Sequence, residues 1–228
     1  MPLAVTLVLA FAALGTWQLE RRTWKLGLIA RVEQRVHAPA AEAPNPEAWP
    51  RLAAENAEYR RLRVRGQFLD AGDTLVQAVS DLGAGYWVLT PLRTDDGRLV
   101  LVNRGFVPPE ARGAVAPVGG PVTVTGLLRL TEPRGGFLRT NDPVAGRWYS
   151  RDVAAIAAAH GLRDVAPYFI DAQQIDGAAR PGTLPVPGLT VVAFHNNHLV
   201  YALTWYTLAL MVACASWRLM REEPVGQD

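Results

Sequence analysis

Residues 199–217, LVYALTWYTLALMVACASW, form a run of nineteen residues without a charged side chain. An α-helix needs about 20 apolar residues to cross a hydrocarbon core, so this run predicts a transmembrane helix over residues 196–217. Aromatic residues near both ends of the run, among them Tyr201, Trp205 and Trp217, suit the two membrane–water interfaces. The chain is therefore expected to be a membrane protein.

The N-terminal residues 1–19 form a second uncharged segment, which the basic residues Arg21 and Arg22 follow. Two interpretations are open: a first transmembrane helix, or a cleaved signal peptide in which residues 10–12, AFA, resemble a small-x-small cleavage site. No basic segment precedes the apolar run, which favours the transmembrane helix. The same lack of basic residues suggests that the native chain starts further upstream.

The polar residues lie between these two segments, where 21 of the 23 basic and 18 of the 21 acidic residues are found. The resulting charge of +3 (21 minus 18) is too small for a nucleic-acid-binding surface, so we expect no nucleic acid partner.

The only cysteine, Cys214, lies in the second apolar segment, which excludes a disulfide or a thiolate metal site in the middle domain. Charge leaves the orientation open, because a loop of about 180 residues is translocated largely regardless of its charge.

The middle domain begins with a clear strand pattern at residues 59–68. Its residues alternate between two faces, one with Leu62, Val64, Gly66 and Phe68 and the other with arginines at positions 61, 63 and 65. This period of two predicts a half-buried strand. The arginine face has two interpretations, a binding surface or simply a solvated face. Further strands are predicted at residues 73–79, 86–92, 99–107, 122–130, 168–175 and 189–194. Such short, regular strands indicate an antiparallel sheet or barrel.

One helix interrupts these strands, over residues 151–160, with Ser150 as its N-cap and Gly161 after its last turn. The predicted fold class is an α+β membrane protein in which two transmembrane helices flank a β-dominated extracytoplasmic domain. Its parts are a first span at 1–19, a helical extension and linker at 20–50, the β-rich domain at 51–195, a second span at 196–217 and a tail at 218–228. Within the second part, residues 20–37 are expected to continue the first helix and residues 38–50 to form the linker.

The sequence has none of the common enzyme signatures, such as a Walker loop, HExxH, GxSxG or CxxC. Residues 83–85, GAG, lack the third glycine of a dinucleotide-binding fingerprint and precede a strand. We therefore expect a protein that is not an enzyme, and a membrane enzyme acting at the outer face is the least favoured class.

The segment 195–198, HNNH, lies at the mouth of the second span, where ionisable groups are costly enough to suggest function. In a helix that begins near residue 196, His198, Tyr201 and Trp205 share one face. An imidazole could bind haem iron there, with aromatic walls for the macrocycle and arginines for its propionates. In an antiparallel pair of spans, Trp17 and Arg21 would supply further walls and counter-charges. The alternative is that these residues only anchor the helix at the interface.

Four segments together resemble the Surfeit locus protein family of cytochrome c oxidase assembly factors, in the order that the family shows. They are residues 14–25 (LGTWQLERRTWK), 59–68 (YRRLRVRGQF), 101–108 (LVNRGFVP) and 196–206 (NNHLVYALTWY). This chain has Phe106 where the family commonly has tryptophan, and it lacks the usual basic stretch before the first span.

The resemblance implies two transmembrane helices with cytoplasmic or matrix tails and a large domain on the periplasmic or intermembrane side. It also implies a role in maturing the haem a centres of oxidase subunit I, with His198 as the candidate ligand of the iron. The many Arg, Ala, Gly and Pro residues are typical of a GC-rich bacterial genome, so we expect the inner membrane of a bacterium.

The leading hypothesis is a chaperone that receives haem a from haem a synthase, binds it transiently through His198 and docks on subunit I, in contact with membrane lipid. The alternative is a scaffold that stabilises an oxidase intermediate without touching haem. In that case Asn103 and Arg104, or the strand arginines, would form the interface with the partner.

Overall fold

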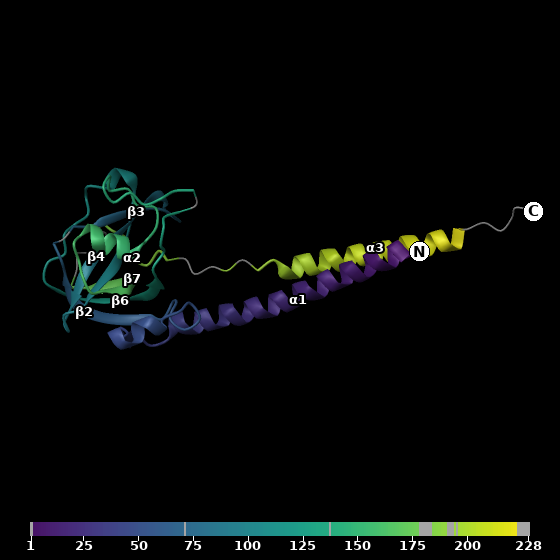
Figure 1. The fold of residues 1–228 in the computed structure, drawn as a ribbon, viewed down its shortest axis with the longest axis horizontal. Coiled ribbons are helices and arrows are strands. Elements are labelled where there is room, and N and C mark those ends of the chain that lie inside the picture. The colour runs from purple at the N-terminus through teal and green to yellow at the C-terminus, as the bar shows by residue number, and fades with distance from the viewer. Residues whose placement is uncertain are drawn as a thin grey trace, which may run out of the picture. The chain divides into compact units, whose positions relative to one another are not determined.

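A computed structural model describes residues 2–70, 72–136, 138–177, 184–190, 194 and 196–222. The chain divides into two compact units, one formed by Met1–Arg31 with Val192–Asp228 and the other by Val32–Val191. Figure 1 shows the elements of both. In chain order they are α1 (Pro2–His37), β1 (Ala41–Glu42), the 3₁₀ helix η1 (Pro46–Arg51), β2 (Arg61–Phe68), β3 (Thr74–Ser80), β4 (Gly83–Thr94), β5 (Leu99–Val107), the 3₁₀ helix η2 (Pro109–Ala111), β6 (Pro121–Leu130), α2 (Val153–Ala159), β7 (Val165–Asp176) and α3 (His198–Glu222).

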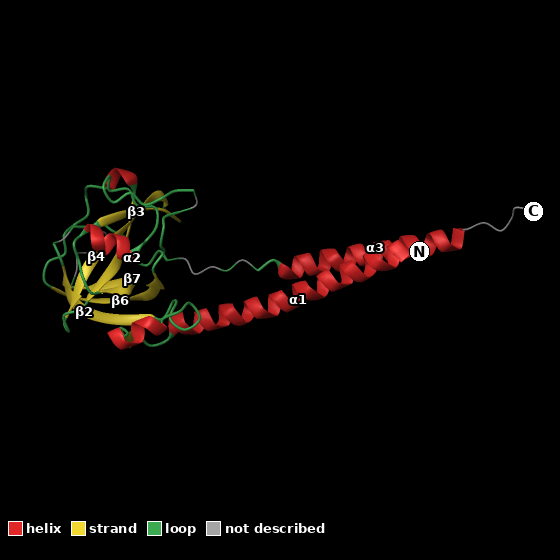
Figure 2. Cartoon of the chain, in the orientation of Figure 1, coloured by secondary structure: helices red, strands yellow, loops and turns green. Residues whose placement is uncertain are grey.

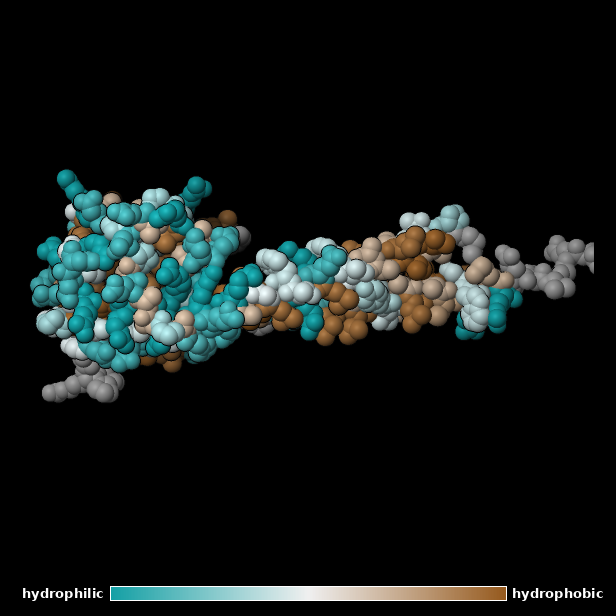
Figure 3. Space-filling model, turned by 90° about the horizontal axis from the view of Figure 1, so that it is seen from below, coloured by the Kyte–Doolittle hydropathy of each residue, from teal (hydrophilic) through white to brown (hydrophobic). Residues whose placement is uncertain are grey.

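The helix unit is built from α1 and α3, which are both long and apolar enough to cross a membrane. Much of the surface of this pair is hydrophobic, whereas the surface of the domain is mainly hydrophilic (Figure 3). Helix α1 runs without interruption to His37, so the predicted helical continuation over residues 20–37 is confirmed. Two long apolar helices therefore flank a β-rich domain, as the sequence predicts.

The two helices meet along a seam whose residues recur at alternating spacings of four and three, the pattern of a coiled coil. The Phe11 ring stacks on Trp205 with 5.7 Å between centroids, and Thr16 is hydrogen-bonded to the Tyr206 hydroxyl at 3.0 Å. A Cβ at Gly15 would lie 2.8 Å from the Tyr206 ring, so glycine is what permits this close approach. The partly or fully buried seam residues are Ala4, Val8, Phe11, Gly15 and Gln18 on α1, and His198, Ala202, Trp205, Ala209 and Val212 on α3.

The domain contains a seven-stranded sheet in the order β1-β2-β6-β7-β5-β4-β3. Its strands are the yellow arrows in Figure 2. The last residues of β2, 66–68, also pair with β4, which closes five strands, β2-β6-β7-β5-β4, into a barrel. At the closing point a Cβ on Gly66 would lie 2.1 Å from the Arg93 carbonyl oxygen, so this position requires glycine.

The strand directions differ in part from the expected antiparallel sheet or barrel. The pairs β5–β7 and β1–β2 are parallel, and the remaining pairs are antiparallel. The chain between β5 and β7 contains β6 and α2, which gives the long connection that parallel neighbours need. Of the expected antiparallel sheet or barrel, the barrel is confirmed, and the antiparallel direction is wrong for these two pairs, because short strands with turns between them say nothing about pairing between distant segments.

The strand positions are otherwise close to those predicted, and β5 has the predicted bounds. The buried and exposed residues of β2 alternate as its sequence indicates. The predicted strand at 189–194 is not observed at Leu189 and Thr190, which lie in irregular chain, and residues 191–193 lie outside the described residues. The predicted linker at 38–50 is more structured than expected, because it contains β1 and the start of η1.

Helix α2 is capped by a different residue from the one predicted. Asp152 is the N-cap and accepts a hydrogen bond from the Ala155 N–H at 3.1 Å. The Ser150 hydroxyl instead accepts from the Gly135 N–H at 2.9 Å, which ties the preceding loop to the helix start. Gly161 follows the helix with a φ of +66°, as predicted for the residue after a last turn.

The core has two parts, one inside the barrel and one beneath α2. Strands of the barrel supply the first, and α2 covers the second on the outer side of β4, β5 and β7 (Figure 2). Fully buried members of the first include Leu62, Leu92, Val102, Val124 and Ile170; those of the second include Leu89, Leu101, Ile156 and Phe169.

The phenol of Tyr168 on β7 provides a pH-dependent reporter of the barrel interior. Its side chain is 2% exposed, and burial raises its pKa to about 12. An unfolded chain releases this proton near pH 10, so folding stability should fall by about 2–3 kcal/mol as the pH rises from 10 through 12. Alkaline absorbance titration should show one of the six tyrosines ionising last, and Tyr168→Phe should remove that step. If the step persists in the variant, another tyrosine is responsible.

Candidate functional site

The candidate site in the helix unit is centred on His198, the first residue of α3. Its ring is half-buried on the seam with α1, and its Nδ1 is hydrogen-bonded to Gln18 Oε1 at 2.7 Å. Because Gln18 pairs with His198 while Phe11 pairs with Trp205, the two helices run antiparallel. The imidazole therefore lies at the first turn of α3, and this turn packs beside the middle of α1.

The structure brings some of the other predicted site residues to the seam and leaves others outside it. Trp205 is partly buried against Phe11, so it lies within the helix–helix contact. Trp17 and Tyr201 are 50% and 54% exposed and leave open aromatic surface on the pair. The face predicted to join His198, Tyr201 and Trp205 is thus divided, with Tyr201 on its outer side.

Positive charge follows the aromatic residues on α1. The Arg21 guanidinium lies 4.8 Å from the centre of the Trp24 ring, so these two side chains share an exposed face. Within the described part of the chain, no carboxylate lies within 4.0 Å of Arg21, Arg22 or Lys25. Arg21 and Arg22 are three and four residues from Gln18, about 4.5 and 6 Å along the helix axis, so these two cations are close to the level of His198.

Gln18 is the site residue that the sequence reasoning missed. The signal was present, because Gln18 carries the only side-chain amide in the uncharged residues 1–19. A polar side chain in an apolar span usually has a partner across the helix interface. The other histidine of the HNNH segment, His195, lies outside the described residues.

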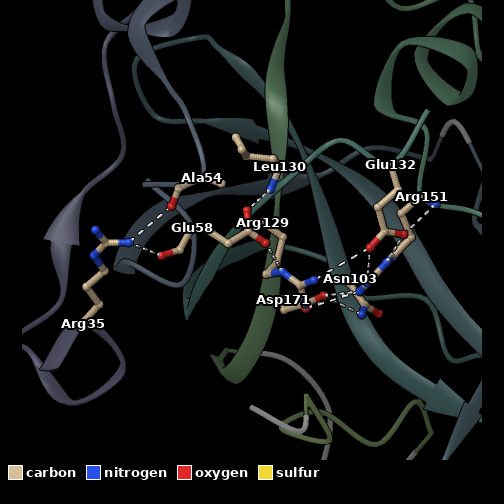
Figure 4. Close-up of polar contacts among 9 residues, drawn as sticks. All are labelled: Arg35, Ala54, Glu58, Asn103, Arg129, Leu130, Glu132, Arg151 and Asp171. Atoms are coloured by element: carbon tan, nitrogen blue, oxygen red, sulfur yellow. Dashed lines mark hydrogen bonds and ion pairs between the residues drawn. The ribbon is translucent and has the colours of Figure 1, made fainter. Parts of the chain in front are cut away.

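A second polar cluster lies inside the domain and is drawn in Figure 4. At its centre is Asp171 of β7, whose side chain is 1% exposed. It accepts hydrogen bonds from Asn103 at 2.8 Å, from Arg129 at 3.0 Å and from Arg151 at 3.2 Å. Around this carboxylate, side chains connect three strands, β5, β6 and β7, with the turn before β2 and the segment before α2. The residues are Glu58, Asn103, Arg129, Glu132, Arg151 and Asp171.

The electrostatics of this cluster favour its ionised form. Burial acts to raise the pKa of Glu132, but hydrogen bonds and charge from Arg151 outweigh it and lower that pKa. Burial acts to lower the pKa of Arg129, but the charge of Asp171 and the hydrogen bond to Glu58 outweigh burial and raise that pKa. Two arginines thus face three carboxylates, and each buried charge is compensated by a neighbour.

The structure places Asn103 and Arg104 in the interior of the domain, not on its surface. Besides donating to Asp171, Asn103 accepts from the Gly105 N–H at 3.1 Å. Arg104 is 4% exposed and donates to the Ala116 carbonyl oxygen at 2.6 Å. Burial lowers the pKa of its guanidinium, and Asp73 at 3.5 Å partly offsets this effect. A direct contact of these two side chains with a partner would need them exposed, so any contribution to binding must pass through the segments that they hold.

The comparisons with known proteins cover both units. The profile of the SURF1 family matches residues 5–210. Surfeit locus protein 1 of Rattus norvegicus is 39% identical over 216 residues, which are 86% of this chain and 67% of the rat protein. The Homo sapiens protein of the same name is 39% identical over 218 residues, 86% and 69% of the two chains. The SURF1-like protein of Monosiga brevicollis is 35% identical over 227 residues, 92% and 83%.

Proposed function

Because the chain belongs to the SURF1 family, whose members are cytochrome c oxidase assembly factors, we propose that it is a non-enzymatic carrier that helps to insert haem a into oxidase subunit I. The observation that carries this proposal is the match over residues 5–210, which includes all but the first three residues of α1, the whole domain and the beginning of α3 with His198. The histidine thus lies within the region that the family shares.

The proposed setting is the inner membrane of a bacterium, with α1 and α3 as its two spans. Two spans place both ends of the chain on one side, so the domain lies on the other, and the periplasmic side is proposed for it. This places the beginning of α3, and therefore His198, at the outer interface of the bilayer. There it could receive haem a from the synthase in the membrane and pass it to subunit I.

The side chains around His198 suit a large, planar, anionic cargo. Its imidazole would be the residue that ligates the iron, and the exposed rings of Trp17 and Tyr201 offer flat apolar surface on the helix pair. The cations at positions 21, 22 and 25, which have no carboxylate within 4.0 Å among the described residues, suit the carboxylates of such a molecule. A carrier must release what it binds, and a single imidazole at an open helix–helix surface holds haem more weakly than two buried ligands do.

The test is the absorption spectrum of the full-length protein, purified in detergent from a host that makes haem a. We expect a haem a spectrum that is lost in His198→Ala, together with a loss of assembled oxidase in cells that carry this variant. His37→Ala is the matched control, because the His37 side chain is 74% exposed at the end of α1. It should behave like the unmodified protein.

The alternative of a haem-independent scaffold predicts a different result. No haem a would then be found in either protein, and oxidase assembly would still require the chain but tolerate His198→Ala. That combination would overturn the carrier proposal while leaving the role in oxidase assembly in place.

A further inference from the structure

The hydrogen bond between Gln18 and His198 joins two helices through residues 180 positions apart in the sequence. Its 2.7 Å length between Oε1 and Nδ1 is that of a well-formed contact. An amide oxygen has lone pairs but no hydrogen, so the ring nitrogen must be the donor. With Oε1 facing the ring, this contact favours a neutral His198 that carries its proton on Nδ1.

This assignment decides which atom of the imidazole is available to a metal. A neutral imidazole has one ring proton, so a ring protonated at Nδ1 keeps the lone pair of Nε2 free. Within the described residues, His198 has no second hydrogen-bond partner. A histidine that ligates a metal commonly donates its other N–H to a carbonyl or carboxylate, which fixes its tautomer and orientation.

The packing of the helix pair explains why Gln18 can reach the ring. Gln18 follows Gly15 by three residues on the seam, and Ala202 follows His198 by four. Both Gly15 and Ala202 are buried and small, so the two backbones approach closely at this level. An amide in an apolar helix is also costly without a partner, which favours the paired arrangement.

We propose that Gln18 is the positioning residue of His198: it holds the imidazole in the Nδ1–H tautomer and presents Nε2 as the iron-binding atom. The part concerning iron rests on the proposed function, whereas the tautomer is a property of the protein alone.

The tautomer can be measured directly in the full-length, ligand-free protein. Labelling histidines with ¹⁵N allows NMR to distinguish a protonated Nδ1 from a protonated Nε2, and His198→Ala assigns the signal. We expect Nδ1–H in the unmodified protein and in Gln34→Leu, a matched control because Gln34 is exposed on the same helix. Gln18→Leu should lose that state, and Gln18→Glu, which keeps an acceptor oxygen, should retain it.

Two results would overturn the proposal. One is a proton on Nε2 in the unmodified protein, because Gln18 would then donate its amide N–H to Nδ1. The other is an unchanged tautomer in Gln18→Leu, because the ring would then be fixed by something else.

A titration with iron protoporphyrin IX as the probe tests the consequence for binding. Removing such an outer hydrogen-bond partner typically costs about 10–100-fold in metal affinity, and we expect a loss of that size in Gln18→Leu but not in Gln34→Leu. Equal affinity in both variants would overturn the positioning role. If the unmodified protein binds no porphyrin, the carrier proposal fails, and the NMR result still decides the tautomer.

Discussion

Replacing Asp171 with alanine is expected to destabilise the domain by about 3–5 kcal/mol, the usual cost of removing one partner from a buried ion pair. The carboxylate is 1% exposed and accepts hydrogen bonds from Arg129, Arg151 and Asn103. Its removal leaves two guanidinium groups and an amide buried without their shared acceptor. Urea unfolding of the full-length protein in detergent, followed by tryptophan fluorescence, should show the midpoint falling.

Asp95→Ala is the matched control for this experiment, because Asp95 is exposed in the turn after β4. A surface change of this kind should stay within about 0.5 kcal/mol of the unmodified protein. Asp171→Asn keeps the shape but removes the charge, so an intermediate loss is expected. If Asp171→Ala unfolds at the unmodified midpoint, the cluster does not stabilise the domain.

Gly105→Ala should destabilise the domain by at least about 3 kcal/mol. Gly105 has a φ of +134°, which residues with a Cβ rarely adopt, and a Cβ there would lie 2.2 Å from the Val186 carbonyl oxygen. The neighbouring Phe106 exchanges two backbone hydrogen bonds of 2.9 Å with Val186, so relieving the clash would break this bridge. The same unfolding assay measures the loss.

Two further glycines separate the causes of this effect. Gly113 has open space around it and no positive φ, so Gly113→Ala should be neutral or stabilise slightly. Gly97 also has open space but a φ of +85°, so Gly97→Ala should show backbone strain alone, about 1–2 kcal/mol. A Gly105→Ala loss no larger than that of Gly97→Ala would contradict a steric clash with Val186.

Local patterns in the sequence predicted the local parts of the fold. The alternation in β2 follows from a period of two, and the continuous α1 follows from an apolar run that leads into a helical segment. The same patterns left an open sheet and a barrel as alternatives, because closure depends on β2 meeting β4 and on β7 lying parallel to β5. These pairings are decided by how distant segments pack together.

The same distinction holds for the candidate site. His198 was found because an ionisable residue at the mouth of an apolar helix is unusual. Gln18 was missed because its importance comes from a contact across the pair, and Trp205 was expected on an open wall because helix periodicity does not say which face meets another helix. The segment at Asn103 and Arg104 has a distinctive composition, but only burial showed that it serves the interior of the domain.

The antiparallel pairing of α1 with α3 has a consequence for biosynthesis. The two helices flank the domain in the sequence, so the whole domain is synthesised between them. The contact of Gln18 with His198 therefore cannot form until α3 has been synthesised and has joined α1. A chain that stops before α3 would have the first helix and the domain but no imidazole beside Gln18, so the site forms only after the domain has been synthesised.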